Sequence, residues 1–149
     1  MHIKKINNNT YQIKIFKIID IYNMSYIKEL TTNIIKKLKK KNKLKKEIEI
    51  DIYPDHYETI IILKDYRKLI NLSNTTEVKI NIHTDTIFLY QIDFPNEFNY
   101  NGTVYYYQNK YYLKIKDITK EKYFYLKEHS ILIFKDTSKI VEEGIKIKI

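Results

Sequence analysis

A run of lysines between residues 36 and 46 is the part of the sequence best suited to bind a charged partner. It contains eight lysines and no acidic residue, and subtracting these eight from the formal net charge of +9 leaves only +1 for the rest of the chain. Lysine ammonium groups contact phosphates as point charges, which gives affinity that depends on salt and little on base sequence. The run therefore favours an anionic partner. Nucleic acid is the first candidate, and an acidic protein or an anionic lipid surface is the alternative.

Helical spacing divides this run into an apolar side and a charged side. On a helical wheel, four lysines fall away from Ile34 and Leu38 and are expected to form a solvent-facing ridge: Lys36, Lys39, Lys40 and Lys43. We refer to these four as the lysine ridge. Arginine would suit bidentate phosphate or base contacts better, and Arg67 is the single arginine of the chain. Binding through the ridge should therefore show weak sequence preference.

Codon usage offers a second explanation of the lysines. Lys, Ile, Asn and Tyr dominate the composition, and A- and T-rich codons encode all four. The ridge would then be a solvated helix face whose lysines reflect the codon usage of an AT-rich genome. Composition alone would spread lysine more evenly along the chain, so the clustering favours a function. Both explanations remain open at this stage.

A hairpin rich in tyrosine is the second candidate site. Five tyrosines and three lysines occur between residues 105 and 116, and aromatic rings interleaved with cations can stack on single-stranded bases. Tyrosine is also a strong strand former that packs well in cross-strand pairs, so at least one side of this hairpin is expected to pack internally. The candidate aromatic contact surface consists of Tyr105, Tyr107 and Tyr112.

Histidine and acidic residues gather near two predicted turns, but with no spacing typical of an active site. Asp51, Asp55, His56 and Glu58 surround one turn, and His83 precedes the other. Metal binding or acid–base catalysis requires such groups to converge, and no HExxH or comparable ligand spacing occurs. Turn propensity explains Asp55 and His56 more simply. The sequence therefore predicts no catalytic residue and no metal site.

Missing residue types exclude several further chemistries. The chain has no cysteine, which excludes disulfides, thiolate zinc sites, iron–sulfur clusters and cysteine nucleophiles. Its two glycines are too few and too far apart for a phosphate-binding loop or a dinucleotide fingerprint. No GxSxG nucleophile elbow is present. We therefore expect no cofactor and favour a non-enzymatic role.

The lysine ridge is predicted to lie on a helix from about residue 24 to about residue 43. The apolar positions of this segment recur at spacings of three and four, which is typical of one helical stripe, and they are Ile27, Leu30, Ile34 and Leu38. Asn23 or Ser25 can cap its start. Lysines crowd its end, where the helix dipole is negative.

Strands surround this helix. Alternation of apolar and polar residues predicts a hairpin within residues 3–15 and strands at 48–52 and 57–63, joined by a turn at Pro54. Residues 1–65 therefore read β-β-α-β-β. The polar, irregular segment 66–76 is the best candidate for a boundary.

The remaining residues are mainly of strand type. Val78 to Ile82 alternates and is expected to return through a turn at 84–85 into strand 87–92. The tyrosine hairpin covers 104–115, residues 117–129 are ambiguous, and 131–134 is a short strand. A helical turn at 138–143, closed by Gly144, precedes a last strand at 145–149.

Together these patterns predict an α+β fold. One amphipathic basic helix packs on an antiparallel sheet in a ββαββ half, and a mainly β half follows. We expect a single α+β domain over residues 1–149, which can be subdivided into 1–65 and 76–149. The hydrophobic fraction of 44% supplies enough apolar material for a core.

The expected function is that of a small binding protein. Its lysine-rich helix would contact an anionic partner, nucleic acid or an acidic protein. The alternative is a protein–protein interaction module, such as an adaptor or a phage or mobile-element inhibitor, that acts through a strand edge or the tyrosine surface. The N-terminus has no apolar stretch after its charges, and the longest aliphatic run is 60–63, so we expect a cytoplasmic or organellar location and no transmembrane segment.

Overall fold

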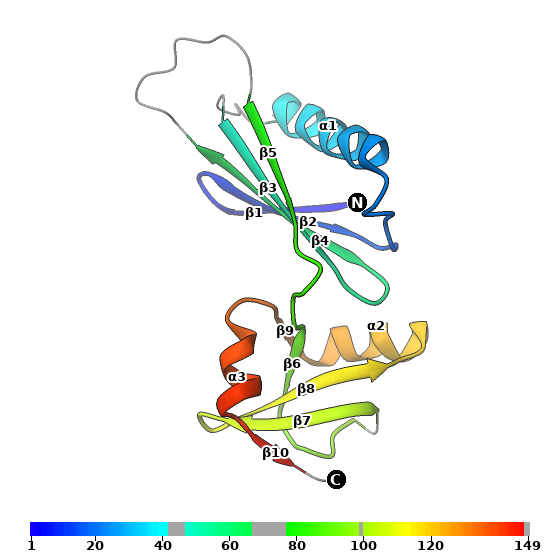
Figure 1. The fold of residues 1–149 in the computed structure, drawn as a ribbon, viewed down its shortest axis with the longest axis vertical. Helices are drawn as coiled ribbons and strands as arrows, with labels where there is room; N and C mark the ends of the chain where they lie inside the picture. The colour runs from blue at the N-terminus through cyan, green and yellow to red at the C-terminus, as the bar shows by residue number, and fades with distance from the viewer. Residues whose placement is uncertain (42–46, 67–76, 99, 148–149) are drawn as a thin grey trace. The chain divides into compact units, whose positions relative to one another are not determined.

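The computed structural model of the chain describes residues 1–41, 47–66, 77–98 and 100–147, with the backbone alone at 39–41 and 66. The chain divides into two compact units, Met1–Thr84 and Asp85–Ile149, called here the first and the second unit (Figure 1). The described residues form two five-stranded sheets and three helices. The predicted α+β class is confirmed, as are the helix packed on a sheet and the mainly β second half.

The first unit contains one helix and five strands among its described residues. In chain order they are β1 (His2–Asn7), β2 (Thr10–Ile15), α1 (Met24–Lys41), β3 (Glu47–Pro54), β4 (Thr59–Tyr66) and β5 (Glu77–Ile82). The order in the sheet is β1-β2-β4-β3-β5. All neighbours are antiparallel except β3 and β5, which are parallel. The predicted ββαββ order is therefore present, with one further strand at the edge.

Helix α1 covers one face of this sheet, as Figure 1 shows. Aliphatic side chains from alternate positions of the strands meet the buried stripe of the helix, and the fully buried ones are Ile13, Ile27, Ile34, Ile50, Ile52, Ile61 and Leu63. The opposite face carries the intervening residues, which are mostly polar on β3 and β5. Ile60 and Ile62 of β4 are also buried on this second face.

Strand β5 corrects one prediction. The sequence predicts a hairpin between residues 78–82 and 87–92, but β5 pairs with β3, and the returning segment belongs to the other sheet. The parallel register places Ile50 opposite Ile80 and Ile52 opposite Ile82. Because a period-2 pattern shows which residues share a face but not which strand lies beside them, the sequence could not indicate this pairing.

The other edge of the first sheet is β1. All six of its residues are exposed, including Ile3, and a register shift between Lys5 and Asn7 interrupts its pairing with β2. The strand is therefore held by β2 on one side only, and its own side chains bury little surface.

The second unit is built around the other sheet. Its elements are β6 (Leu89–Ile92), β7 (Asn101–Tyr107), β8 (Lys110–Asp117), α2 (Lys120–His129), β9 (Ile131–Ile133), α3 (Thr137–Glu143) and β10 (Ile145–Ile147). The order in the sheet is β10-β7-β8-β6-β9, antiparallel throughout. The predicted hairpin at 104–115 and the helical turn before Gly144 are confirmed as β7–β8 and α3.

Helices cover both faces of this second sheet. Tyr123 and Leu126 of α2 are fully buried, and the Tyr123 ring meets the Tyr90 ring edge-on at 6.5 Å between centroids. On the opposite face, Ile140 of α3 packs in a cluster with Leu89. The ambiguous segment 117–129 thus contains a helix. Its apolar residues 123–126 are consecutive, so no three–four spacing marked it.

Candidate functional site

Helix α1 begins where the sequence predicts. The Asn23 side-chain oxygen accepts a hydrogen bond from the Tyr26 backbone N–H at 3.2 Å, and the Asn23 carbonyl accepts one from the Ile27 N–H at 3.0 Å. Asn23 is therefore the N-cap, which confirms one of the two predicted caps. Ile27, Thr31, Ile34 and Leu38 are buried at spacings of three and four, so the helix orientation on the sheet is fixed by packing.

The structure describes the lysine ridge in part. Lys36 lies on the exposed side of α1, as predicted, and its neighbour Lys37 is exposed as well. Lys39 and Lys40 belong to the last helical turn, with the backbone alone described, and Lys43 lies outside the described residues. Among the ridge lysines, Lys36 is the one whose side chain the structure describes, and it lies on the exposed side of a packed helix.

The helical neighbours of Lys36 carry no negative charge. Positions three and four residues away are occupied by Thr32 and Asn33 on one side and by Lys39 and Lys40 on the other. Like charges at these spacings destabilise a helix by a few tenths of a kcal/mol per pair, and opposite charges would stabilise it by a similar amount. Repulsion between these lysines therefore weakens the helix, while the negative end of the helix dipole favours the same lysines.

Net charge differs sharply between the two units. Met1–Thr84 contains 17 basic and 9 acidic residues, a net charge of +8, whereas Asp85–Ile149 contains 10 and 9, a net charge of +1. The second unit has a similar density of charges but balances them. The excess positive charge of the chain therefore belongs to the unit that contains α1.

The tyrosines of the second candidate site lie in a core. Tyr105 and Tyr112 are 4% and 6% exposed and pack with Leu89 and Ile140. Burial, with a smaller contribution from Tyr107, raises the pKa of the Tyr112 phenol. Tyr107 is partly buried, and its hydroxyl donates to a Glu143 carboxylate oxygen at 3.4 Å. The rings of Tyr105 and Tyr112 stabilise the packing of α3. They would have to leave this core in order to stack on a ligand.

A polar cluster that the sequence did not predict lies on β3 and β5, on the face opposite α1. The Asp51 carboxylate is buried and accepts hydrogen bonds from His83 Nε2 at 2.8 Å and from Asn81 Nδ2 at 3.1 Å. The His83 ring stacks on Tyr53 with 4.5 Å between centroids. In the sequence, Asp51 and His83 lie near separate turns, and the parallel pairing of β3 with β5 brings them together.

This β3–β5 cluster can hold a histidine in one orientation. Burial raises the pKa of the Tyr53 phenol, and the negative charges of Asp51 and then Glu49 raise it further, so the phenol stays protonated near neutral pH. Asp51 orients His83, which is an arrangement that acid–base catalysis uses. In the described part of the chain, no group of three or more His, Asp or Glu side chains is placed to hold a metal ion.

At the turn between β3 and β4, the predicted Asp55–His56 pair is local. His56 Nδ1 lies 3.0 Å from Asp55 Oδ1, and the Asp55 backbone N–H donates to the Glu58 carbonyl at 2.9 Å. The turn is confirmed, and its two side chains bond to each other within it. It therefore contributes to the hairpin geometry, as the sequence suggested.

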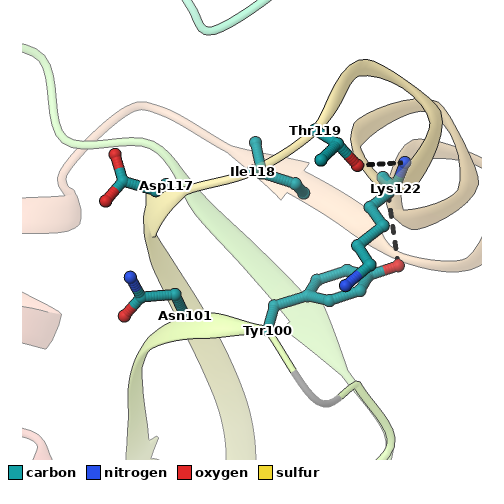
Figure 2. Close-up of a pocket in the computed structure, with 6 residues that line it drawn as sticks. All are labelled: Tyr100, Asn101, Asp117, Ile118, Thr119 and Lys122. Atoms are coloured by element: carbon teal, nitrogen blue, oxygen red, sulfur yellow. Dashed lines mark hydrogen bonds between the residues drawn. The ribbon is translucent and has the colours of Figure 1, made fainter.

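A pocket of about 320 Å³ opens in the second unit at the start of α2 (Figure 2). Thr119 caps this helix by accepting from the Lys122 backbone N–H at 3.4 Å, and the Tyr100 hydroxyl donates to the Lys122 carbonyl at 3.2 Å. Figure 2 shows the Lys122 side chain across the Tyr100 ring, with its ammonium 5.7 Å from the ring centroid. These bonds join α2 to Tyr100, the residue that precedes β7, and they account for the positions of these groups.

Comparisons with known proteins found no match among protein families, curated proteins or solved structures. None of the described helices has the length and apolar character that crossing a membrane requires.

Proposed function

We propose that the protein is a non-enzymatic binding protein whose lysine-rich helix α1 contacts an anionic partner, with nucleic acid as the partner class, inside the cytoplasm or an organelle. The observation that carries the proposal is the exposed, acid-free end of α1. Lys36 and Lys37 face solvent on a helix whose other side is buried, and no helical neighbour of Lys36 is acidic.

The charge distribution supports this proposal. A unit of net charge +8 attracts polyanions at long range, and the packed stripe of α1 holds the lysines of its exposed side in a fixed row. Phosphate binding to such a row releases condensed counterions, so the affinity should fall linearly with the logarithm of salt concentration. Lysine contacts position a backbone and read no base edge, which predicts weak sequence preference.

The experiment is a salt series on a charge-reversed protein. Binding of a labelled mixed-sequence oligonucleotide is measured by fluorescence anisotropy for the wild type and for the variant in which Lys36, Lys39, Lys40 and Lys43 are all replaced by Glu. We expect the wild type to bind with a negative salt slope and the variant to lose binding, with an unchanged circular dichroism spectrum.

A matched control uses four exposed lysines of the second unit. The same reversal at Lys110, Lys114, Lys116 and Lys146 changes the net charge of the chain by the same amount and should leave most of the affinity intact. Retained binding in the α1 variant, or equal losses in both variants, would contradict the proposal. A protein partner recovered equally well after nuclease treatment would instead support the interaction-module alternative.

A further inference from the structure

The segment that connects β2 to α1 exposes large apolar side chains. Phe16 is 54% and Tyr22 is 87% exposed, and Ile18 and Met24 are also largely exposed. Together with Lys17, these residues lie between the end of a buried strand and the first turn of the helix that carries the lysine ridge.

This exposure is selective. Ile15, Ile19 and Ile27, from the same stretch of chain, are 6% exposed or less and anchor the segment to the core of the first unit. Burying a side chain of this size contributes roughly 1.5–3 kcal/mol, so leaving several in water within nine residues sacrifices a substantial stabilisation. Exposed apolar groups concentrated in this way are typical of a contact surface.

Charges of both signs accompany the exposed rings. The Asp20 carboxylate accepts a hydrogen bond from the Tyr22 backbone N–H at 3.1 Å, and Lys17 lies on the other side of Ile18 and Ile19. The Lys17 ammonium lies 5.7 Å from the centroid of the Tyr26 ring, which places it against the first turn of α1. Lys28 and Glu29 are both exposed one turn further along, and the outer side of the helix then continues through the uncharged residues Thr32 and Asn33 to Lys36 and Lys37. The positive charges of this face therefore outnumber its acidic ones and increase towards the end of the helix. From Met24 to Lys37 this face extends about 20 Å at the rise of an α-helix.

We infer that this face binds a single-stranded nucleic acid, with Phe16 and Tyr22 stacking on bases while the lysines of α1 contact phosphates. The inference rests on the proposed function and adds that the nucleic-acid partner is single-stranded. Sequence-tolerant single-strand binding combines a positively charged track with aromatic platforms, and both are present here on one unit. A duplex hides its base faces within the stack and would leave the two rings without a role.

Replacement of both rings by leucine tests the inference. Phe16→Leu/Tyr22→Leu keeps large apolar side chains on the segment but removes the aromatic faces. A labelled pyrimidine-rich single strand and a duplex of the same length are titrated by fluorescence anisotropy. We expect the wild type to prefer the single strand, and the double variant to bind it roughly fivefold or more weakly, since each stacked ring is worth at least that factor.

Two exposed aromatic residues of the second unit give a matched control. Phe94→Leu/Tyr125→Leu removes rings of 65% and 54% exposure and should bind the single strand as the wild type does. Folding of every variant is checked by its denaturation midpoint.

The outcomes separate the inference from the proposed function. If the Phe16/Tyr22 variant binds single strands normally while charge reversal of the lysine ridge abolishes binding, the inference is wrong and the proposed function stands. If neither change affects binding, the proposed function itself is wrong. A third outcome would also overturn the inference. In that case the wild type shows no preference for the single strand but binds vesicles of anionic phospholipid, and this binding survives the leucine changes but is lost in Ile18→Ser. Such a result would identify a lipid surface as the partner.

Discussion

In the first unit, an aliphatic core lies between a sheet and a single helix, whereas in the second unit helices pack on both faces of the sheet and tyrosines fill much of the core. The second face of the first sheet instead carries a hydrogen-bonded cluster around Asp51. Except for the exposed Phe94 and Tyr125, the aromatic residues of the second unit are buried or partly buried. The first unit exposes Phe16 and Tyr22 and carries most of the excess positive charge of the chain. Aromatic content and lysine content therefore indicate a binding surface only where packing leaves them exposed.

The largest expected effect tests the aromatic core of the second unit. Tyr123→Ala removes a fully buried ring that contacts Tyr90 and should lower the free energy of unfolding by roughly 3–5 kcal/mol, the cost of removing a buried aromatic side chain. Urea denaturation measures it. Tyr125→Ala, at an exposed position of the same helix, is the control and should cost far less. Equal costs would show that the ring of Tyr123 does not carry the packing of α2.

The second prediction concerns the polar face of the first sheet. Asp51→Ala removes the acceptor of the His83 ring N–H and one of the two acceptors of the Asn81 amide, which keeps its bond to Glu49, and should cost roughly 1–3 kcal/mol of stability. Asp85→Ala, at an exposed position, should change stability by less than about 0.5 kcal/mol. If both substitutions behave alike in urea denaturation, hydrogen bonding around Asp51 does not hold β5 to β3.

A third, smaller effect compares the helix caps. Asn23→Ala removes the oxygen that accepts from the Tyr26 N–H and should cost about 1 kcal/mol, and Thr119→Ala at the start of α2 should cost a similar amount. Ser25→Ala serves as the control, because Ser25 was the other predicted cap and lies inside α1. A larger loss from Ser25→Ala than from Asn23→Ala in thermal denaturation would reassign the cap.

The smallest effect appears at alkaline pH. In the folded state the pKa of the Tyr53 phenol is raised above its ordinary value of 10.0. The free energy of unfolding should therefore fall as the pH rises from about 10 through the raised pKa, because the unfolded chain loses this proton first. Tyr53→Phe should lessen that fall. Asp51→Asn removes a negative charge and should bring the Tyr53 pKa down, while the Tyr112 pKa stays where burial sets it. NMR titration of labelled tyrosine rings measures both. Equal pKa shifts of Tyr53 and Tyr112 in Asp51→Asn would contradict a local effect of the Asp51 charge.

Local patterns in the sequence were sufficient for the elements that bury one regular face. The stripe from Ile27 to Leu38 predicted α1, and strand-forming residues on either side of turn residues predicted the hairpins of both units. Long-range pairing was not predictable in this way. Nothing in residues 77–82 indicates that they lie beside β3, so the contact between Asp51 and His83 could not be found.

The candidate site was predictable to a similar degree. The exposed side of Lys36 followed from helical spacing, because the apolar stripe determines which side is buried. The burial of Tyr105 and Tyr112 depended on α3, a short helix that reaches them from about 30 residues away along the chain. The exposure of Phe16 and Tyr22 could hardly be predicted from the sequence, because the segment that contains them is as apolar as a buried segment.

The exposed edge strand β1 has a consequence for solubility. Its free edge offers backbone N–H and C=O groups that a strand of another molecule could pair with, which is the first step of edge-to-edge aggregation. Lys4 and Lys5 occupy the middle of that edge, both exposed, and the register shift before Asn7 bends its end. Two ammonium groups at the centre of a six-residue strand oppose the stacking of a second identical copy. We therefore expect these two lysines, which lie outside the ridge, to oppose edge-to-edge pairing at β1.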